Sequence, residues 1–365
     1  MDICMVCDPM LDTYGPVAPA LLLAQNMMAR NYRVSIVSTR ISSEVQRFLK
    51  QNSLAFVNLD AHLISGKEPP FSWLEVWARE AFLKLNSRGF RTHNSIVINF
   101  SHTLAVPSTV WYVQGPTTDA IRDMQNDLPL RYRFLYKTLK PLLEFADNRL
   151  IRNMASGSNL IIANSKYCAS MYETRNLDVD RIIYPPLDCK AFKPTPTPQN
   201  DYVLTYLGKE TDFSTLKKIG DAGVRVRIFG SKSPFKPKQV LKRRNIEFLG
   251  RVSTQELVGL YSNALFTLFT FNHEPFGYIP VESMACGTPV LTYNSQGPSE
   301  TVIDGVTGWL ANTREESIRL ALSLWKGGYP PTMRANARER ALRFSEENIA
   351  GEWIQVVERL AQETS

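Results

Sequence analysis

Hydrophobic positions along this chain alternate between short apolar runs and longer stretches in which apolar residues recur every three or four positions. The short runs have the length of buried strands, and the longer stretches have the period of amphipathic helices. In the first half the pattern predicts a helix over 17–30 and strands over 3–7, 34–38, 95–100, 109–113 and 159–163. Strands that alternate with helices in this way are typical of α/β proteins with parallel sheets.

The second half repeats the rhythm. It predicts strands over 202–207, 224–229, 246–249, 265–271 and 289–293. Glycine follows three of them, as Gly208, Gly230 and Gly250. Ser253 and Glu256 have the spacing of a capping box, which predicts a helix from there to about 262. Strands that end in glycine before a helix indicate ligand binding at the carboxyl ends of the sheet.

A change of composition at 193–200 indicates a connector between two domains. Three prolines alternate with other residues there, and proline fits neither a central strand nor a helix interior. A chain of 365 residues suits two domains. We therefore predict an N-terminal domain over 1–192 and a C-terminal domain over 193–345. An amphipathic helix over 346–365 follows, and we expect it to pack back on the N-terminal domain.

Composition and charge narrow the class of protein. Apolar residues make up 44% of the chain and charged residues 21%, as in ordinary globular proteins. No apolar run is long enough to span a bilayer, and the N-terminus does not resemble a secretory signal. The net charge of +7 permits attraction to nucleic acids, anionic membranes or phosphorylated small molecules. We expect a cytoplasmic protein.

The five cysteines are odd in number and widely spread, which argues against a disulfide framework. Cys4 and Cys7 have C-x-x-C spacing, but no further cysteine or histidine pair completes a zinc site. Both lie within the first predicted strand, where positions three apart point to opposite faces. We therefore predict no metal site in this chain, and no other cofactor.

Two acids in the second half suggest a ligand site. Glu274 follows an apolar strand and precedes the turn Pro275-Phe-Gly277, after which the sequence becomes helical. Glu282 lies about one turn inside this short helix. Backbone N–H groups at a helix N-terminus suit an anion or a hydrogen-bonding sugar. The two carboxylates are too far apart to act on one bond as an acid–base pair, so we expect them to contact different parts of one ligand. On spacing alone, Glu282 could also face solvent.

The run from Glu274 to Val290, EPFGYIPVESMACGTPV, resembles the E-x7-E signature of the GT4 family of retaining glycosyltransferases. Gly297-Pro-Ser-Glu300, followed by Ile303-Asp-Gly305 and Gly308, is similar to the family's next landmark. Ala163-Asn-Ser165 and Tyr184-Pro-Pro-Leu-Asp188 look like the end of its acceptor domain, particularly in lipid-linked-oligosaccharide mannosyltransferases. The resemblance implies the GT-B fold, in which two Rossmann-like domains face each other across a cleft.

The resemblance also implies roles for particular residues. Glu274 matches the acid that contacts the donor sugar, and Glu282 matches the acid that binds the nucleotide ribose. Phe276 and Gly277, with Tyr278 beside them, match the loop that binds sugar hydroxyls. Gly15 matches the glycine that lets the first domain approach the donor phosphates, although Tyr14 replaces its usual glycine neighbour. We expect backbone around 229–231 and 251–253, including Phe229, Gly230 and Val252, to line the base pocket.

The cations that neutralise the diphosphate depart from the family pattern. The family places an arginine after the first glycine of the second domain and a lysine about five residues later. This chain has Lys209 after Gly208, and then Lys217. Lysine supplies a point charge without the fork of arginine. Lys232 is a further candidate, and Lys217 and Lys232 are equally compatible with surface positions.

A second departure concerns the histidine that the family places at the end of a strand in the first domain. Gln114 stands at that position, and it can donate and accept hydrogen bonds but cannot titrate. His102 ends a neighbouring predicted strand and is the alternative. Either residue could face the sugar.

A basic, amphipathic stretch at 131–152 suggests contact with a membrane. Six basic residues are interleaved with Phe134, Phe145 and several leucines. Such a helix can lie on an anionic membrane surface and would suit a lipid-linked acceptor. The alternative is a core helix with a solvated charged face. Pro141 should break or kink the segment.

We therefore predict a metal-independent glycosyltransferase that uses a UDP- or GDP-sugar and retains anomeric configuration. The acceptor would be a sugar, a glycan or a lipid-linked glycan, with peripheral contact to the cytoplasmic membrane face through 131–152. Two other classes of protein fit the sequence less well. A nucleotide-sugar epimerase resembles the E-x7-E stretch poorly, and a non-catalytic module for nucleic acid lacks any recognised nucleic-acid motif. We expect no nucleic-acid partner.

Overall fold

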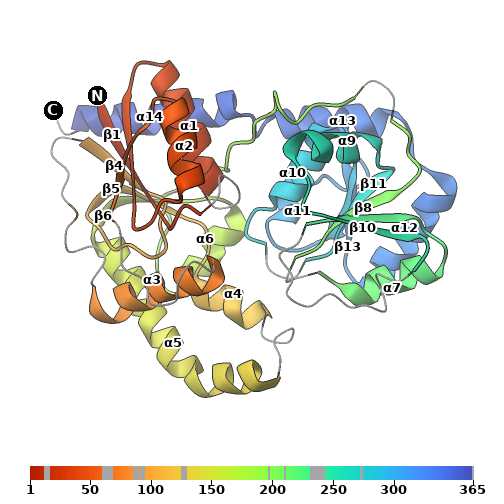
Figure 1. The fold of residues 1–365 in the computed structure, drawn as a ribbon, viewed down its shortest axis with the longest axis horizontal. Coiled ribbons are helices and arrows are strands. Elements are labelled where there is room, and N and C mark those ends of the chain that lie inside the picture. Colours follow the sequence, from red (N-terminus) through yellow and green to blue (C-terminus); the bar gives the residue numbers. More distant parts are fainter. Residues whose placement is uncertain are drawn as a thin grey trace. The chain divides into compact units, whose positions relative to one another are not determined.

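The computed structural model describes residues 1–11, 17–59, 69–84, 90, 95–124, 130–195, 198–208, 211–230, 243–271 and 274–363. The chain divides into two compact units, shown in Figure 1. The first comprises 1–122, 129–186 and 346–365, and the second comprises 123–128 and 187–345. Apart from the short segment 123–128, the second unit begins at Leu187, a few residues before the start predicted at 193.

The first unit is built on a parallel sheet. Among the described residues its strands have the order β3-β2-β1-β4-β5-β6-β7. Their bounds are β1 (Asp2–Cys7), β2 (Arg33–Ser38), β3 (Ala55–Asn58), β4 (Ser95–Asn99), β5 (Ser108–Val113), β6 (Ser158–Ala163) and β7 (Arg181–Ile182). Strand β1 pairs in parallel with both β2 and β4. The order reverses between β1 and β4, and ligands bind at such a switch point in doubly wound sheets.

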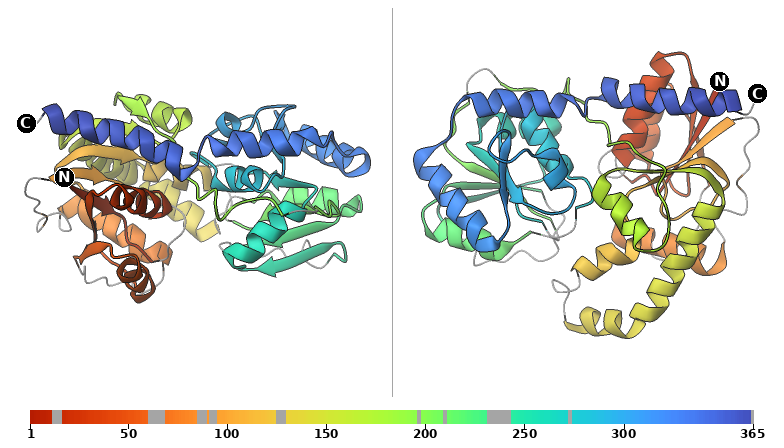
Figure 2. Two further views of the ribbon diagram at one scale, coloured as in Figure 1. Left: turned by 90° about the horizontal axis from the view of Figure 1, so that it is seen from above. Right: turned by 180° about the vertical axis from the view of Figure 1, so that it is seen from behind.

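Helices cover both faces of this sheet, as Figure 1 shows. Their bounds are α1 (Ala18–Ala29), α2 (Ser43–Gln51), α3 (Pro69–Leu83), α4 (Thr117–Met124), α5 (Leu130–Ser156), α6 (Lys166–Glu173) and α14 (Glu346–Glu363). Residues of α1, α2 and α14 pack with Ile3 and Met5 on one face. Residues of α3, α5 and α6 pack with Trp111 and Ile161 on the other. The last helix lies beside α1 (Figure 2), so the chain returns to the first unit at its end.

The second unit repeats the plan with a smaller parallel sheet. Its described strands have the order β10-β9-β8-β11-β12-β13. Their bounds are β8 (Val203–Tyr206), β9 (Val226–Phe229), β10 (Ile246–Gly250), β11 (Phe266–Phe269), β12 (Val290–Tyr293) and β13 (Gly308–Ala311). The switch point here lies between β8 and β11, which pair in parallel. The α/β class and parallel sheets predicted from the sequence are confirmed.

Helices again lie on both faces of the second sheet. Their bounds are α7 (Phe213–Asp221), α9 (Thr254–Asn263), α10 (Tyr278–Ala285), α11 (Pro298–Thr301), α12 (Arg314–Gly327) and α13 (Thr332–Leu342). Residues of α7 and α12 pack against one face, and residues of α9 and α10 against the other. The capping box predicted for α9 is present, because Ser253 and Glu256 bond each other's backbone N–H groups.

The structure tests the predictions about the cysteines and about membrane-spanning helices. All five cysteines are free and buried. Cys7 packs with Ile3 and Met5, whereas Cys4 packs with Val6 in a separate cluster, so the two thiols lie on opposite faces of β1 as predicted. None of the helices in the described ranges combines the length and hydropathy that a membrane span requires.

Candidate active site

The loop after β8 forms one side of the switch point in the second unit. Gly208 is buried there, and its N–H donates to Thr211 Oγ1 at 2.8 Å. Asp212 caps α7, because its carboxylate accepts from the backbone N–H groups of Ser214 and Thr215. This cap occupies donors that would otherwise be available to an anion. Lys209, which follows Gly208 in the sequence, lies outside the described residues.

Glu274 lies on the other side of the switch point, in the loop after β11. Its backbone N–H donates to Gln296 Oε1 at 2.8 Å, and its carbonyl accepts from the Gly297 N–H at 3.0 Å. Its carboxylate Oε1 accepts from the Gly277 N–H at 3.1 Å. The side chain is half-buried. The backbone and the carboxylate of Glu274 are therefore both held by neighbouring groups.

Gly277 allows the chain to turn from this loop into α10. Its φ of +93° lies in a region that favours glycine, and it stands at the N-cap without a side-chain cap. Phe276 is buried, with ring centroids 5.3 Å from Tyr278 and 5.7 Å from Phe344. The residues of the predicted sugar-binding loop thus lie together with Glu274 at one helix N-terminus.

Glu282 lies one turn into α10 in a poorly solvated position. Burial raises its pKa to about 7, and a hydrogen bond of 2.9 Å from the Tyr261 hydroxyl opposes that shift. The pKa of Tyr278 is also raised, first by burial and then by the negative charge of the Glu282 carboxylate. The Glu282 side chain is half-buried and its carboxylate accepts from Tyr261, so it does not simply face solvent. A poorly solvated carboxylate that accepts from Tyr261 is well suited to accept further hydrogen bonds from ligand hydroxyls.

Aromatic side chains connect Glu282 to the end of β9. The Phe229 ring lies 5.8 Å from the Tyr261 ring and 5.2 Å from the Tyr206 ring. Gly230 has a φ of +94°, and a Cβ there would come within 2.4 Å of Tyr206. Glycine is therefore required at this position for two independent reasons.

Val252 belongs to the same apolar cluster as Phe229. It also lines a cavity of about 300 Å³, between α9 and β10, with Tyr202, Arg227 and Glu256. Of the other predicted site residues that the structure describes, none lines this cavity. The cavity is therefore separate from the residues around Glu274.

Of the three lysines predicted to neutralise the diphosphate, the structure describes Lys217. Lys217 pairs with Asp221 at 2.9 Å across one turn of α7, and its side chain is 51% exposed. This geometry is that of a surface ion pair, and the structure does not bring Lys217 to the loop of Glu274. Lys232, like Lys209, lies outside the described residues.

The first unit carries its own candidates at the switch point of its sheet. Asp8 follows β1, and its carboxylate accepts from the backbone N–H groups of His102 and Thr103, each at 3.1 Å. His102 is half-buried at the end of β4. The Gln114 side-chain amide donates to the Phe100 carbonyl at 3.2 Å, so that amide supports the loop before His102. Gly15 lies outside the described residues.

Sequence reasoning missed Gln296 and Asp8. Gln296 stands 22 positions after Glu274, and only the folded chain brings its amide to the Glu274 N–H. Asp8 gave a signal that could have been used, since an acid directly after the first strand lies at the ligand-binding edge of a doubly wound sheet.

Two doubly wound sheets of the same strand order define the class of this protein, which has the GT-B fold. Anabaena Alr3699/HepE, solved in complex with UDP, has the same fold with a TM-score of 0.71 and 16% identity, covering 98% of this chain and 100% of that one. Residues 211–342 match the family model of glycosyl transferases group 1. This match identifies the second unit as a domain of that family, and the resemblance stated from the sequence is confirmed.

Two curated relatives are similar over shorter segments. A probable sucrose-phosphate synthase of Thermosipho melanesiensis is 32% identical over 123 residues, which is 32% of this chain and 29% of the relative. The GDP-Man:Man(3)GlcNAc(2)-PP-Dol alpha-1,2-mannosyltransferase of Mus musculus is 34% identical over 125 residues, which is 32% of this chain and 25% of the relative. The matched segments thus span under a third of each relative's length. The family match lies within the second unit, and each of these relatives matches about a third of this chain.

Proposed function

We propose that the chain transfers a sugar from a UDP- or GDP-linked donor to a sugar, glycan or lipid-linked acceptor, with retention of configuration and without a metal. The proposal places the sugar at Glu274 and the ribose at Glu282. UDP in the Anabaena structure and the GDP-mannose named for the mouse relative support the two donor bases. Retention of configuration is supported by the family resemblance.

The arrangement of the two acids carries this proposal. Glu274 is fixed on a loop before the N-terminus of α10, and Glu282 lies within that helix beside Tyr261. A ligand that contacts both must be extended, with hydroxyl groups at two separated points. A nucleotide sugar has hydroxyls on its ribose and on its sugar, and a diphosphate between them.

The chemistry follows from the charges that develop when the donor is cleaved. The bond between the anomeric carbon and the phosphate oxygen breaks with its electrons on the phosphate, so positive charge develops on the carbon. The Glu274 carboxylate stabilises that carbon. The N-terminus of α10 has no side-chain cap and favours negative charge. We assign the remaining neutralisation of the phosphates to Lys209 and Lys232 rather than to Lys217, and no metal has a role.

A panel of nucleotide sugars tests the proposed reaction. We expect release of UDP or GDP from one donor of the panel when mono- and oligosaccharide acceptors are supplied, unchanged by EDTA. The anomeric configuration of the product should match that of the donor by NMR. Inverted product would contradict retention, and activity that EDTA abolishes would contradict metal independence. Formation of an epimer without acceptor would indicate the epimerase class instead.

The exposed face of α5 supports the further proposal of contact with a membrane. Phe134 and Phe145 are 75% and 64% exposed, and Leu135, Leu139 and Leu142 are exposed as well. In Figure 1 α5 extends away from the first sheet and changes direction along its length, and Pro141 lies inside the helix. Large apolar side chains in such a row are unusual on a protein that contacts only water.

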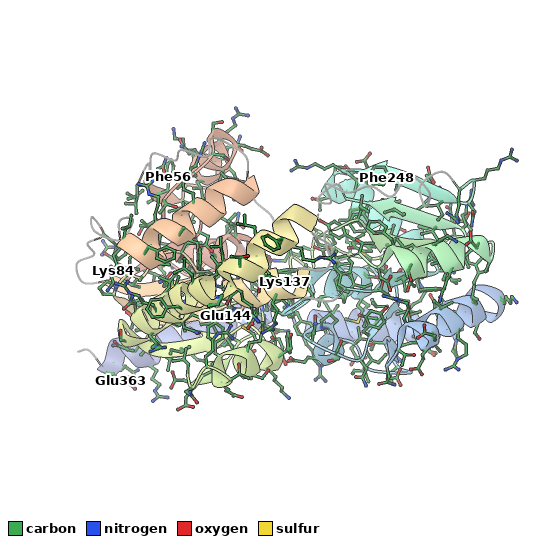
Figure 3. All side chains as sticks on the ribbon, turned by 90° about the horizontal axis from the view of Figure 1, so that it is seen from below. Phe56, Lys84, Lys137, Glu144, Phe248 and Glu363 are labelled. Atoms are coloured by element: carbon green, nitrogen blue, oxygen red, sulfur yellow. The ribbon has the colours of Figure 1, made fainter. Side chains whose placement is uncertain are left out.

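Positive charge accompanies this apolar row. Lys137, Arg149 and Arg152 are exposed, and Lys140 pairs with Glu144 at 3.7 Å. Figure 3 shows α5 from below, with Lys137 and Glu144 labelled. Apolar anchors flanked by cations favour the interface of an anionic bilayer, at about 1 kcal/mol for each basic residue near the surface. We therefore propose a cytoplasmic enzyme that contacts the membrane face peripherally, a location that five free, buried thiols also suit.

Vesicle sedimentation tests this contact. We expect the protein to bind vesicles that contain phosphatidylserine, to bind pure phosphatidylcholine at least tenfold more weakly, and to dissociate as salt is raised. Replacing both Phe134 and Phe145 with serine should abolish sedimentation. Val57→Ser serves as a control, because Val57 is an exposed apolar residue on β3, away from α5. Equal sedimentation of the double variant and the control would contradict the proposed contact.

A further inference from the structure

Gln296 and Gly297 together hold the backbone of Glu274. The Gln296 side-chain oxygen accepts from the Glu274 N–H at 2.8 Å, and the Gly297 N–H donates to the Glu274 carbonyl at 3.0 Å. Both polar backbone groups of one residue are thus tied to two consecutive residues of another loop. The Glu274 carboxylate, held by the Gly277 N–H, can then adopt few orientations.

Gln296 adopts an unfavourable backbone conformation to make this contact. Its φ is +60°, in the left-handed region that costs a residue other than glycine about 1 kcal/mol. The Ser299 hydroxyl donates to its carbonyl at 2.7 Å and helps to hold that conformation. Glycine would adopt this backbone without strain, but it has no amide to offer to Glu274. Strain that persists next to a candidate catalytic group suggests a role for the side chain.

Gly297 completes the contact because it has no side chain. A Cβ at this position would lie 2.2 Å from the Pro275 carbonyl oxygen and 2.5 Å from the Phe276 Cα. The loop that carries Glu274 therefore packs directly on the backbone of Gly297.

We propose that Gln296 is a positioning residue, which acts on sugar transfer by fixing Glu274 through its N–H group. This inference rests on the proposed role of Glu274 at the sugar. It predicts that changes at Gln296 affect kcat and leave donor affinity almost unchanged. The Gln296 side-chain oxygen is bonded to Glu274, whereas the proposed function places the ribose at Glu282 and the base at 229–231 and 251–253.

Two substitutions separate positioning from stability. Gln296→Met keeps the length and the strained backbone but removes the acceptor, and Gln296→Gly removes both the acceptor and the strain. We expect both variants to lower kcat by about 10- to 100-fold, with the donor Kd within about twofold of wild type. The glycine variant is less strained, so it should melt at a higher temperature than the methionine variant. If kcat follows the melting temperature and the glycine variant keeps wild-type turnover, the positioning role is overturned.

Ser53→Gly is the matched control, because Ser53 also has a positive φ, of 55°, on an exposed turn of the first unit. It should relieve strain without changing kcat. A second check combines Gln296→Met with Glu274→Gln. If Gln296 acts through Glu274, the double variant should be no slower than Glu274→Gln alone. Additive losses would contradict the inference.

Hydrogen exchange distinguishes failure of this inference from failure of the proposed function. The Glu274 amide should be protected in the wild type and should exchange at least tenfold faster in both Gln296 variants. A protein that turns over no donor but shows this change would refute the proposed function and leave the contact itself standing. Unchanged protection would refute the contact whatever the activity.

Discussion

Glu274→Gln is expected to lower kcat for sugar transfer by about 10²- to 10³-fold, while the donor Kd changes by less than about threefold. The substitution keeps the size of the side chain and an oxygen that can accept from the Gly277 N–H. It removes the negative charge that the proposed mechanism places at the anomeric carbon. Because that charge acts chiefly when the bond breaks, the loss should appear in kcat. Steady-state kinetics together with calorimetric titration of the donor measure both quantities.

Glu315→Gln is a suitable control for this variant. Glu315 is an exposed carboxylate in the first turn of α12, within the same unit. Its loss should leave kcat unchanged, which excludes an effect of net charge alone. A Glu274→Gln enzyme with wild-type kcat, or one whose donor affinity falls as much as its kcat, would refute the role assigned to Glu274.

Glu282→Gln is expected to weaken nucleotide binding by about 10- to 100-fold, since hydrogen bonds to a charged acceptor are the stronger ones. In the wild type, affinity should rise about tenfold between pH 6 and pH 8, because the carboxylate binds ribose hydroxyls and burial raises its pKa to about 7. Calorimetric titration of UDP and GDP across this range measures the effect. The glutamine variant should show no such dependence, and Tyr261→Phe should move the midpoint upward because the tyrosine hydroxyl lowers that pKa.

Glu282→Gln should also stabilise the protein in the absence of ligand. The folded-state pKa of Glu282, about 7, lies above its ordinary value of 4.5, so the folded state binds more protons between these values. The contribution of Glu282 to the free energy of unfolding of the wild type therefore falls as the pH rises from about 4.5 to about 7. Above that pH the contribution is constant. Glu282→Gln should be more stable than wild type by roughly 1–3 kcal/mol at pH 8 and no more stable near pH 4.5. Urea unfolding at the two pH values measures the difference, and an equally stable variant at pH 8 would contradict the burial of the charge.

Much of the fold could be predicted because its central strands are short, continuous apolar runs. Strands β1, β8 and β12 are buried along their lengths, and burial on both faces requires such runs. Strand β3 was missed because it lies at the sheet edge, where exposed and half-buried residues alternate. Strand β13 was missed because it is short and begins with a glycine.

The candidate site could be predicted where its residues are close in sequence. Glu274, Gly277 and Glu282 follow one another along a loop and a helix, so their spacing already places them near one ligand. Gln296 could not be found in this way, because its contact with Glu274 depends on how two separate loops pack. Lys217 was proposed as a phosphate ligand from its position after Gly208. The structure instead pairs it with Asp221, one turn further along α7.

A crystal structure with the nucleotide sugar that the panel selects tests the central claim most directly. We expect the ribose hydroxyls within hydrogen-bonding distance of the Glu282 carboxylate. We also expect the anomeric carbon of the sugar beside Glu274, with sugar hydroxyls at the loop of Phe276 and Gly277. A nucleotide sugar that touches neither carboxylate, or one bound in the cavity beside Arg227, would contradict it.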